Sequence, residues 1–290
     1  MIIVTGATGQ LGRAILERLV LRVSPASVGA SARNPEMAAA LAALGVRVRR
    51  GDFAAPETLA HAFEGATQVL LVSSSARASG GDTLAQHQAA IEAARAAGAR
   101  RIVYTSHMAA SASSAFAPAR DHAATEAMLA RSGVAWTALR NGFYASSGLA
   151  FVGDAFTTGV FEAPLDGPTA WTAHADLAEA AAAILADEGR LDGPTPALVA
   201  PEALDFTALA ALASEISGRP LVRRVIPDDE LRARFVARGA PVAMAEIALG
   251  FYKASRDGEF RASAAERTLE QLLGRPPIAM REVMARKLAS

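Results

Sequence analysis

Short apolar runs alternate with helical patterns through the first half of the chain. After the first run, Leu11, Ile15 and Leu19 recur at four-residue spacing, which predicts a helix with one apolar face. Parallel strands need crossover helices, so the alternation predicts an α/β fold of the Rossmann type with a doubly wound parallel sheet. The predicted strands occupy residues 2–5, 27–32, 46–50, 68–72, 101–105 and 134–139. The predicted helices that follow occupy residues 34–44 (with Asn34 as N-cap), 56–63, 83–97 and 121–131.

The second half of the chain is less regular. Residues 146–170 contain glycine and proline and show no clear element, whereas an alanine-rich helix is predicted at 176–187. A short strand is predicted at 197–199, and further helices from Phe206 onward. We therefore expect a Rossmann domain at 1–145 and a smaller α/β lobe at 146–290. The two are expected to be interleaved, with residues 176–200 packing back on the Rossmann sheet.

Composition and charge exclude several classes of partner. The 290 residues are 51% hydrophobic and 20% charged, which is typical of a globular chain with a sizeable core. Basic and acidic residues number 29 each, so no net charge favours nucleic acid or an anionic membrane. The absence of cysteine excludes disulfides and thiolate chemistry and favours the cytoplasm. An early first strand argues against a secretory signal, and no apolar stretch approaches the length of a membrane span.

A glycine-rich turn follows the first predicted strand. Residues 5–12 read TGATGQLG and lead into a helix, an arrangement that aims backbone N–H groups and a helix N-terminus at a pyrophosphate. Gly6 is expected to allow the tight turn, Gly9 the approach of the phosphates and Gly12 the close packing of helix on strand. The spacing GxxGxxG departs from the usual GxGxxG, and an ordinary turn is the alternative. We interpret the motif as a dinucleotide site.

The end of the second predicted strand indicates which dinucleotide is bound. A free ribose 2′-hydroxyl is usually held there by an acidic residue, but this chain has Ala32 and Arg33. A guanidinium can pair bidentately with a 2′-phosphate, so the position favours NADP(H) over NAD(H). A solvated arginine after a strand is the alternative.

Polar residues also close the third, fourth and fifth predicted strands. Asp52 and Phe53, after the third strand, are expected to flank the adenine, or else to form a simple turn. The others are small hydroxyl residues that let the nicotinamide ribose approach, although polar residues are common wherever strands end. These residues are Asp52 and Phe53, then Ser73, Ser74 and Ser75, then Thr105 and Ser106.

The chain lacks the Tyr-x-x-x-Lys pair with which short-chain dehydrogenases protonate a reduced carbonyl. Its only lysines, Lys253 and Lys287, follow no tyrosine at that spacing. Reduction of a ketone yields a basic alkoxide that needs a positioned acid, whereas a quinone or a cationic dye does not. The absence therefore favours an electron-poor acceptor, or no chemistry. Serine-hydrolase, P-loop and zinc-protease motifs are missing too, and no metal is expected.

Two further features are candidates for a role near the nicotinamide. His122 and Glu126 lie one helical turn apart and could form a hydrogen-bonded unit over the ring, although a solvated pair is the alternative. The low-complexity segment 109–119 lies between a strand and a helix, at the edge of the sheet where such folds bind ligands. We interpret it as a mobile lid, with a plain surface loop as the alternative.

Several motifs, in order, resemble one known family. They are TGATGQLG, ARNP, LLVSSS, YTS, HAATEAML and LRNGFY, and they span residues 1 to about 145. Together they resemble the NmrA-like atypical short-chain dehydrogenases, in particular the NADPH:quinone oxidoreductase and triphenylmethane reductase branch. The resemblance implies a Rossmann domain with a small C-terminal lobe, NADPH in the cleft and a flat aromatic acceptor over the nicotinamide.

The resemblance also implies roles for individual residues. It places Asn141, Gly142 and Tyr144 at the nicotinamide and acceptor pocket, although Tyr144 could instead pack between the lobes. With His122, Asn141 and Tyr144 form the candidate catalytic set. Trp171 departs from the family pattern and would either reshape the acceptor site or belong to the core. By position, the resemblance assigns Arg33 to the 2′-phosphate. It assigns the ribose region to Ser73, Ser74, Ser75 and Thr105, and the pyrophosphate to Gly6, Ala7, Thr8, Gly9, Gln10 and Leu11.

Three functions follow from these observations. The leading hypothesis is an NADPH-dependent oxidoreductase that passes hydride directly to a quinone or dye and acts mainly by positioning the acceptor. The second is an NADP(H)-binding redox sensor that shows little turnover and reports to a partner. A sugar-nucleotide epimerase or dehydratase ranks last because it normally requires the Tyr-Lys pair. A homodimer is compatible with the sequence.

Overall fold

A seven-stranded parallel sheet lies at the centre of the computed structural model, which describes residues 1–153, 155–263 and 265–289. Its strand order is β10-β6-β5-β4-β1-β2-β3, and every neighbouring pair is parallel. The order reverses between β1 and β4, which is where open α/β sheets bind ligands. The strands are β1 (Ile2–Val4), β2 (Val28–Ala32), β3 (Arg47–Arg50), β4 (Gln68–Leu71), β5 (Arg101–His107), β6 (Ala135–Asn141) and β10 (Gly193–Pro194).

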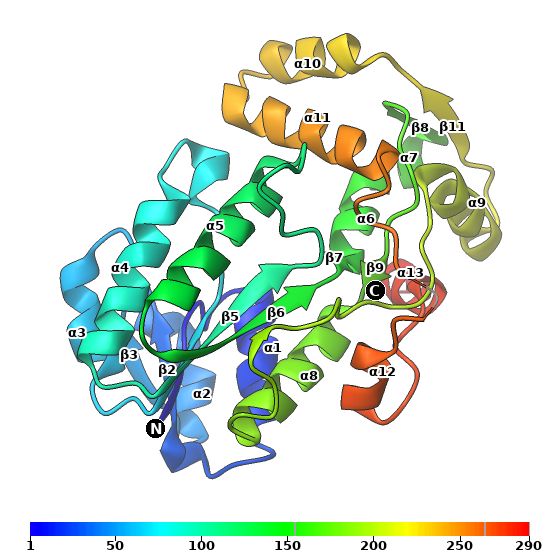
Figure 1. Ribbon diagram of the computed structural model, residues 1–290. Coiled ribbons are helices and arrows are strands. Elements are labelled where there is room, and N and C mark those ends of the chain that lie inside the picture. The colour runs from blue at the N-terminus through cyan, green and yellow to red at the C-terminus, as the bar shows by residue number, and fades with distance from the viewer. Residues whose placement is uncertain (154, 264, 290) are drawn as a thin grey trace.

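Helices cover both faces of this sheet and build a second lobe at one end of it (Figure 1). The α-helices are α1 (Gln10–Leu19), α2 (Ala39–Ala43), α3 (Leu59–Phe63), α4 (Thr83–Ala96), α5 (Ala117–Arg131), α6 (Ala145–Val152), α7 (Ala155–Thr158), α8 (His174–Ala186), α9 (Phe206–Ser217), α10 (Asp228–Ala237), α11 (Val242–Arg256), α12 (Thr268–Leu273) and α13 (Met280–Leu288). The 3₁₀ helices are η1 (Pro25–Ser27), η2 (Pro35–Ala38), η3 (Pro56–Thr58) and η4 (Ala76–Ser79).

The strands are apolar along their whole length because both faces of the sheet are buried. Successive residues point to opposite faces, so Val69 and Leu71 pack in the cluster with α3, α4 and α5, whereas Leu70 packs in the cluster with α1 and α8. Helix α8 lies beside α1 against the sheet, and β10 extends the sheet at its edge (Figure 1). The segment from α8 to β10 thus joins the Rossmann layers, although it follows the first elements of the second lobe in sequence.

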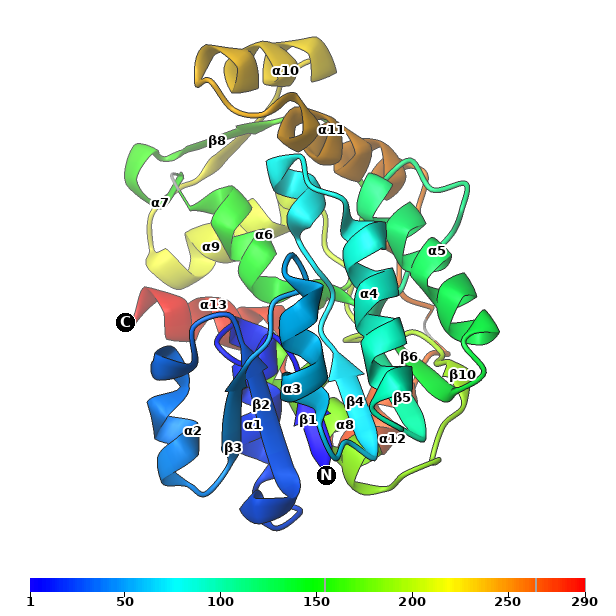
Figure 2. The ribbon, with the colours of Figure 1, turned by 90° about the vertical axis from the view of Figure 1, so that its left-hand side faces the viewer.

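The C-terminal lobe stands over the carboxyl ends of the strands (Figure 2). Its core is rich in aromatic side chains, among them Phe143, Trp171, Phe206, Phe251 and Phe260. Two small parallel sheets, β11-β8 and β7-β9, support it. Among the described residues, no helix is both long and apolar enough to cross a membrane. The strands of these sheets are β7 (Phe143–Tyr144), β8 (Val160–Ala163), β9 (Trp171–Thr172) and β11 (Val222–Val225).

The predicted Rossmann-type α/β fold is confirmed, with differences at individual elements. Residues 146–170, predicted to be irregular, contain most of α6 together with α7 and β8. Helix α5 begins at Ala117 instead of Asp121, because Pro118 lies in its first turn, where proline is favoured. Residues 34–44 form η2 and the short helix α2, and the Asn34 side chain makes no cap hydrogen bond. The strand predicted at 197–199 is reduced to one bridge, between Leu198 and Asn141.

Candidate functional site

The glycine-rich turn connects β1 to α1 at the point where the strand order reverses. Gly6 has a φ of +61°, and Gly9, the N-cap of α1, donates its N–H to the Gly6 carbonyl oxygen at 2.9 Å. A Cβ atom at Gly12 would lie 2.3 Å from that oxygen, so only glycine lets the helix approach the turn this closely. The first N–H groups of α1 have no acceptor inside the helix. The turn thus has the predicted geometry and presents donors to an anion.

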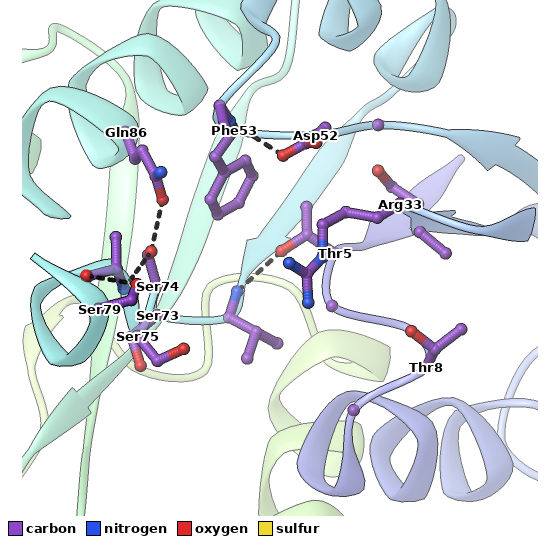
Figure 3. A pocket seen from close by; sticks show the side chains of 18 residues that line it. Thr5, Thr8, Arg33, Asp52, Phe53, Ser73, Ser74, Ser75, Ser79 and Gln86 are labelled. Carbon is purple, nitrogen blue, oxygen red and sulfur yellow. Dashed lines mark hydrogen bonds between the residues drawn. The ribbon is translucent and has the colours of Figure 1, made fainter. Parts of the chain in front are cut away.

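A cavity of about 400 Å³ lies beyond the carboxyl ends of β1 to β4. The glycine-rich turn forms one wall, and the segments after β2, β3 and β4 form the others (Figure 3). Its volume is within the usual range for small-molecule and cofactor sites. The predicted cofactor-binding residues that line it are Gly6, Thr8, Gly9, Arg33, Asp52, Phe53, Ser73, Ser74 and Ser75.

Other predicted cofactor-binding residues lie outside the lining of this cavity. Ala7 and Leu11 are buried in the core with α1, and Gln10 is exposed at the helix start. Thr105 is buried, and its Oγ1 accepts the N–H of Ser73 at 2.9 Å. Ser106 is buried as well and faces α5. Thr105 therefore fixes the backbone after β4 from behind, whereas the Ser106 hydroxyl donates to Glu126 of α5.

The structure also adds polar lining residues that the motifs did not single out. Gln86 of α4 accepts a hydrogen bond at Oε1 from Ser74 Oγ at 2.5 Å, and Ser79 of η4 also lines the cavity (Figure 3). Ser31 lies near the end of β2, and the strand-end argument used for Ser73 could have found it. No local pattern marks Gln86 or Ser79, because tertiary packing brings them to the cavity.

Arg33 extends into the cavity from the end of β2 (Figure 3). Within the described part of the chain, its guanidinium forms no hydrogen bond or ion pair with another side chain, and the strand-end residue before it is Ala32. Sequence and structure thus agree on an unpaired cation at the position that distinguishes the two dinucleotides.

Asp52 and Phe53 both line the cavity, but they do so differently. Asp52 accepts the N–H of Ala54 at 3.0 Å with Oδ1, so its carboxylate holds the turn after β3, as the simpler interpretation expected. The Phe53 ring instead projects into the cavity (Figure 3). Of the two, the ring is the group available to pack on a flat heterocycle.

Two buried polar atoms without partners lie at the carboxyl ends of β5 and β6. His107 and Asn141 are paired in register, and each is the last residue of its strand. Within the described residues, neither His107 Nε2 nor Asn141 Oδ1 has a hydrogen-bond partner. Buried polar atoms are rarely left unpaired, so both are candidates for contact with a ligand. Gly142 is held by its N–H, which donates to Leu198 at 2.9 Å.

The predicted unit of His122 and Glu126 does not form. His122 Nδ1 lies 2.7 Å from the Tyr104 hydroxyl, whereas Glu126 pairs with Arg140 at 2.7 Å and accepts a hydrogen bond from Ser106 Oγ at 2.6 Å. Both side chains face the sheet, where β5 and β6 offer closer partners than the next turn of α5. Glu126 therefore links α5 to β5 and β6 through Ser106 and Arg140, and His122 contacts Tyr104 of β5 separately.

Comparison with known proteins places this geometry in a family. A family model described as NAD(P)H-binding matches residues 6–188. The chain belongs to this NAD(P)H-binding family. It is 37% identical to quinone oxidoreductase 2 of Escherichia coli over 284 residues, which cover 97% of this chain and 96% of the relative. The resemblance to the quinone oxidoreductase and triphenylmethane reductase branch is thereby confirmed.

Two solved structures of the family align with nearly the whole chain. The Escherichia coli NADPH-dependent quinone oxidoreductase, in complex with NADPH, has a TM-score of 0.90 at 35% identity and covers 99% of this chain and 100% of its own. Triphenylmethane reductase of a Citrobacter species, in complex with NADP(H), has a TM-score of 0.86 at 32% identity, with 99% of each chain covered. The shared architecture therefore includes the C-terminal lobe as well as the Rossmann layers.

Tyr144 packs against the core cluster that contains α1 and α8. Its ring centroid is 4.2 Å from that of His174, at the N-terminus of α8, and the side chain is half-buried. Burial raises the pKa of Tyr144 to about 12, opposed by the Asn141 side chain. Tyr144 is therefore a neutral phenol at physiological pH.

Burial also keeps several imidazoles near this region uncharged. It lowers the pKa of His87, His107 and His174 to about 4, and the pKa of His122 falls well below its ordinary value. For His87 the nearby Asp121 opposes this effect, and for His122 the other imidazoles add to it. His87, His107, His122 and His174 are thus neutral imidazoles at physiological pH.

These lowered pKa values predict a loss of stability in mild acid. Between a pKa of about 6.5 when unfolded and about 4 when folded, the unfolded chain binds more protons, so the free energy of unfolding falls as pH drops through this window. Each such histidine contributes up to about 1.4 kcal/mol per pH unit. Urea unfolding at several pH values should show a shallower acid dependence for His107→Leu. The same substitution at exposed His61 is the control, and equal slopes for the two variants would contradict the prediction.

Segment 109–119 is anchored over its second half, which is at odds with a lid that moves as a whole. Ser114 Oγ donates a hydrogen bond to Glu259, whose other oxygen accepts the N–H of Ala115 at 3.2 Å. Phe116 is buried in the aromatic core, and α5 already begins at Ala117. The segment therefore ties the Rossmann half to the C-terminal lobe.

Trp171 belongs to the core instead of the acceptor site. It is 2% exposed, packs against Phe143, Phe206 and Phe251, and donates Nε1–H to the Leu204 carbonyl oxygen at 2.9 Å. Of the two interpretations of this departure from the family pattern, the structure supports packing.

Proposed function

We propose that this protein is an NADPH-dependent oxidoreductase that transfers hydride to a quinone or a similar electron-poor aromatic acceptor. The observation that carries the proposal is the cavity in which the glycine-rich turn faces Arg33, with no acidic residue at the end of β2. The family relatives named above, which are an NADPH-dependent quinone oxidoreductase and a triphenylmethane reductase, support it.

The residues at the sheet edge fit NADPH at several points. The turn from Gly6 to Gly12 and the N-terminus of α1 suit the pyrophosphate, because the first N–H groups of α1 have no acceptor inside the helix. Arg33 suits the 2′-phosphate, and the Phe53 ring suits the adenine. The unpaired Oδ1 of Asn141 suits the N–H₂ group of the nicotinamide carboxamide. When bound, NADPH supplies a hydride from C4 of its nicotinamide.

The remaining residues position the acceptor and need not supply a strong acid. NADPH, a quinone and one proton give NADP⁺ and a hydroquinone: two electrons and one proton pass as hydride, and the second proton comes from water. The phenolate product is weakly basic, so the missing Tyr-Lys pair is no obstacle. Tyr144, Asn141 and His122 are the proposed residues of this pocket, and their role is to hold a flat ring in place. We propose a small-molecule acceptor and action in the cytoplasm, without nucleic acid.

Steady-state oxidation of NADPH tests this proposal against the sensor hypothesis. We expect saturable turnover with benzoquinones or naphthoquinones. Tight NADPH binding without turnover on any quinone or dye would overturn the enzyme and favour the sensor.

Arg33→Ala is expected to raise the KM for NADPH by about 10- to 100-fold, because a charge-assisted hydrogen bond contributes about 1.5–3 kcal/mol. The KM for NADH should not change, since NADH lacks the phosphate. Arg22→Ala, which removes an exposed arginine outside the cavity lining, is the matched control. An equal loss with both dinucleotides would mean that Arg33 does not contact the 2′-phosphate.

A further inference from the structure

His107 carries a buried N–H donor whose orientation is fixed. Its Nδ1 accepts the N–H of Ala109 at 3.1 Å. A neutral imidazole has one proton, so an acceptor at Nδ1 places that proton on Nε2. Nε2 is buried, and among the described residues it has no hydrogen-bond partner. The fold therefore supplies a donor and leaves it unpaired.

Four aromatic or imidazole rings surround His107. Phe143, Phe260 and Phe116 lie 5.1, 5.6 and 5.9 Å from the imidazole, between ring centroids, and His122 stacks on it at 5.9 Å. An unpaired donor in such an apolar setting costs about 1–3 kcal/mol. Burial also keeps His107 neutral, with a pKa of about 4. A ligand with an oxygen acceptor and a flat apolar body would satisfy both the donor and the rings.

The place of His107 in the sheet puts this donor beside the proposed nicotinamide contact. His107 is paired in register with Asn141, whose Oδ1 is also buried and has no partner among the described residues. Two residues earlier on the same face of β5, Thr105 holds Ser73 of the cofactor cavity. At the ends of neighbouring strands, Asn141 thus offers an acceptor suited to the N–H₂ group of a carboxamide. His107 offers a donor suited to a carbonyl oxygen.

We propose that His107 Nε2–H donates a hydrogen bond to a carbonyl oxygen of the quinone and thereby selects carbonyl-bearing acceptors over cationic triarylmethane dyes. The inference rests on the proposed function and names the acceptor class of that site. As hydride arrives, the electron pair moves onto the quinone oxygen, so the bond strengthens in the transition state. A dye cation without an oxygen acceptor leaves the N–H unpaired and brings positive charge toward it.

The carboxylates around this cluster are already engaged by other groups. Glu126 pairs with Arg140, Asp121 pairs with Arg77, and Glu259 accepts hydrogen bonds from Ser114 and Ala115. Within the described residues, the rings around His107 therefore present no carboxylate without a partner to a dye cation.

The test compares His107→Leu with His107→Gln, using His61→Leu as the surface control. For naphthoquinone we expect His107→Leu to lower kcat/KM by about 100-fold, the usual effect of removing a donor aimed at developing negative charge. Reduction of a cationic triarylmethane dye should not fall. His107→Gln keeps an N–H donor and should recover part of the quinone activity.

A binding measurement without turnover accompanies these rates. Naphthoquinone is titrated into each variant saturated with NADP⁺, which cannot reduce it. We expect weaker binding for His107→Leu, with unchanged NADP⁺ affinity. Equal losses with quinone and dye, or unchanged quinone binding and kinetics, would overturn the role of His107 while leaving the proposed function intact. Absence of turnover in the unmodified protein would instead overturn the proposed function.

Discussion

Replacing Gly12 with alanine is expected to raise the dissociation constant for NADPH by about 100-fold or more, which is the scale of effect when a binding group is displaced by about 1 Å. The added Cβ would lie 2.3 Å from the Gly6 carbonyl oxygen, 2.8 Å from its carbonyl carbon and 3.0 Å from the Thr5 oxygen. All three are backbone atoms, so no side chain can rotate away. The turn and the start of α1 must separate, which moves the N–H groups proposed to hold the pyrophosphate.

Fluorescence titration with NADPH measures this effect, and urea unfolding separates it from a loss of folding. Gly153→Ala is the matched control, because its backbone is helical and the nearest atom to its Cβ would be 3.3 Å away. NADPH affinity equal to that of the unmodified protein, in a folded Gly12→Ala variant, would show that the turn does not hold the dinucleotide.

Replacing Trp171 with alanine is expected to lower the free energy of unfolding by about 3–5 kcal/mol, the usual cost of truncating a large buried aromatic side chain. The indole fills space between Phe143, Phe206 and Phe251 and reaches across to Leu204. Trp171→Phe keeps a ring but leaves the Leu204 carbonyl without its donor, so its stability should fall between those of the alanine variant and the unmodified protein.

Denaturant unfolding measures both Trp171 variants, with Val236→Ala as control, since Val236 is 66% exposed. If Trp171 lined the acceptor site instead, Trp171→Ala would keep its stability and change the KM for the acceptor. That outcome would contradict the core assignment.

Local patterns predicted the part of the fold in which each element carries its own signal. Central parallel strands are buried on both faces and appear as apolar runs, so Val69–Leu71 could be located without the structure. Helix α6 could not, because its sequence ASSGLAFV begins with small residues and ends in an unbroken apolar run, so no polar face marks it as a helix. Asn34 was predicted as an N-cap by residue type, but its side chain makes no cap bond.

In the candidate site, too, local sequence predicted some residues and missed others. Gly6, Gly12 and Arg33 could be predicted because their roles depend on neighbours in the sequence: a turn, a helix and a strand end. His107 and Gln86 could not, because their surroundings come from distant segments. The pairing of His122 with Glu126 failed for the same reason, since helical spacing places two residues on one face and does not reveal a competing partner on the sheet.

The most direct test of the account is a single turnover in which the protein with bound NADPH is mixed rapidly with excess naphthoquinone. The account predicts that bound NADPH is consumed in one phase whose rate saturates with quinone and slows when the transferred hydrogen at C4 is replaced by deuterium. Bound NADPH that persists in the presence of quinones and dyes alike would contradict hydride transfer and leave a protein that binds NADP(H) without reducing an acceptor.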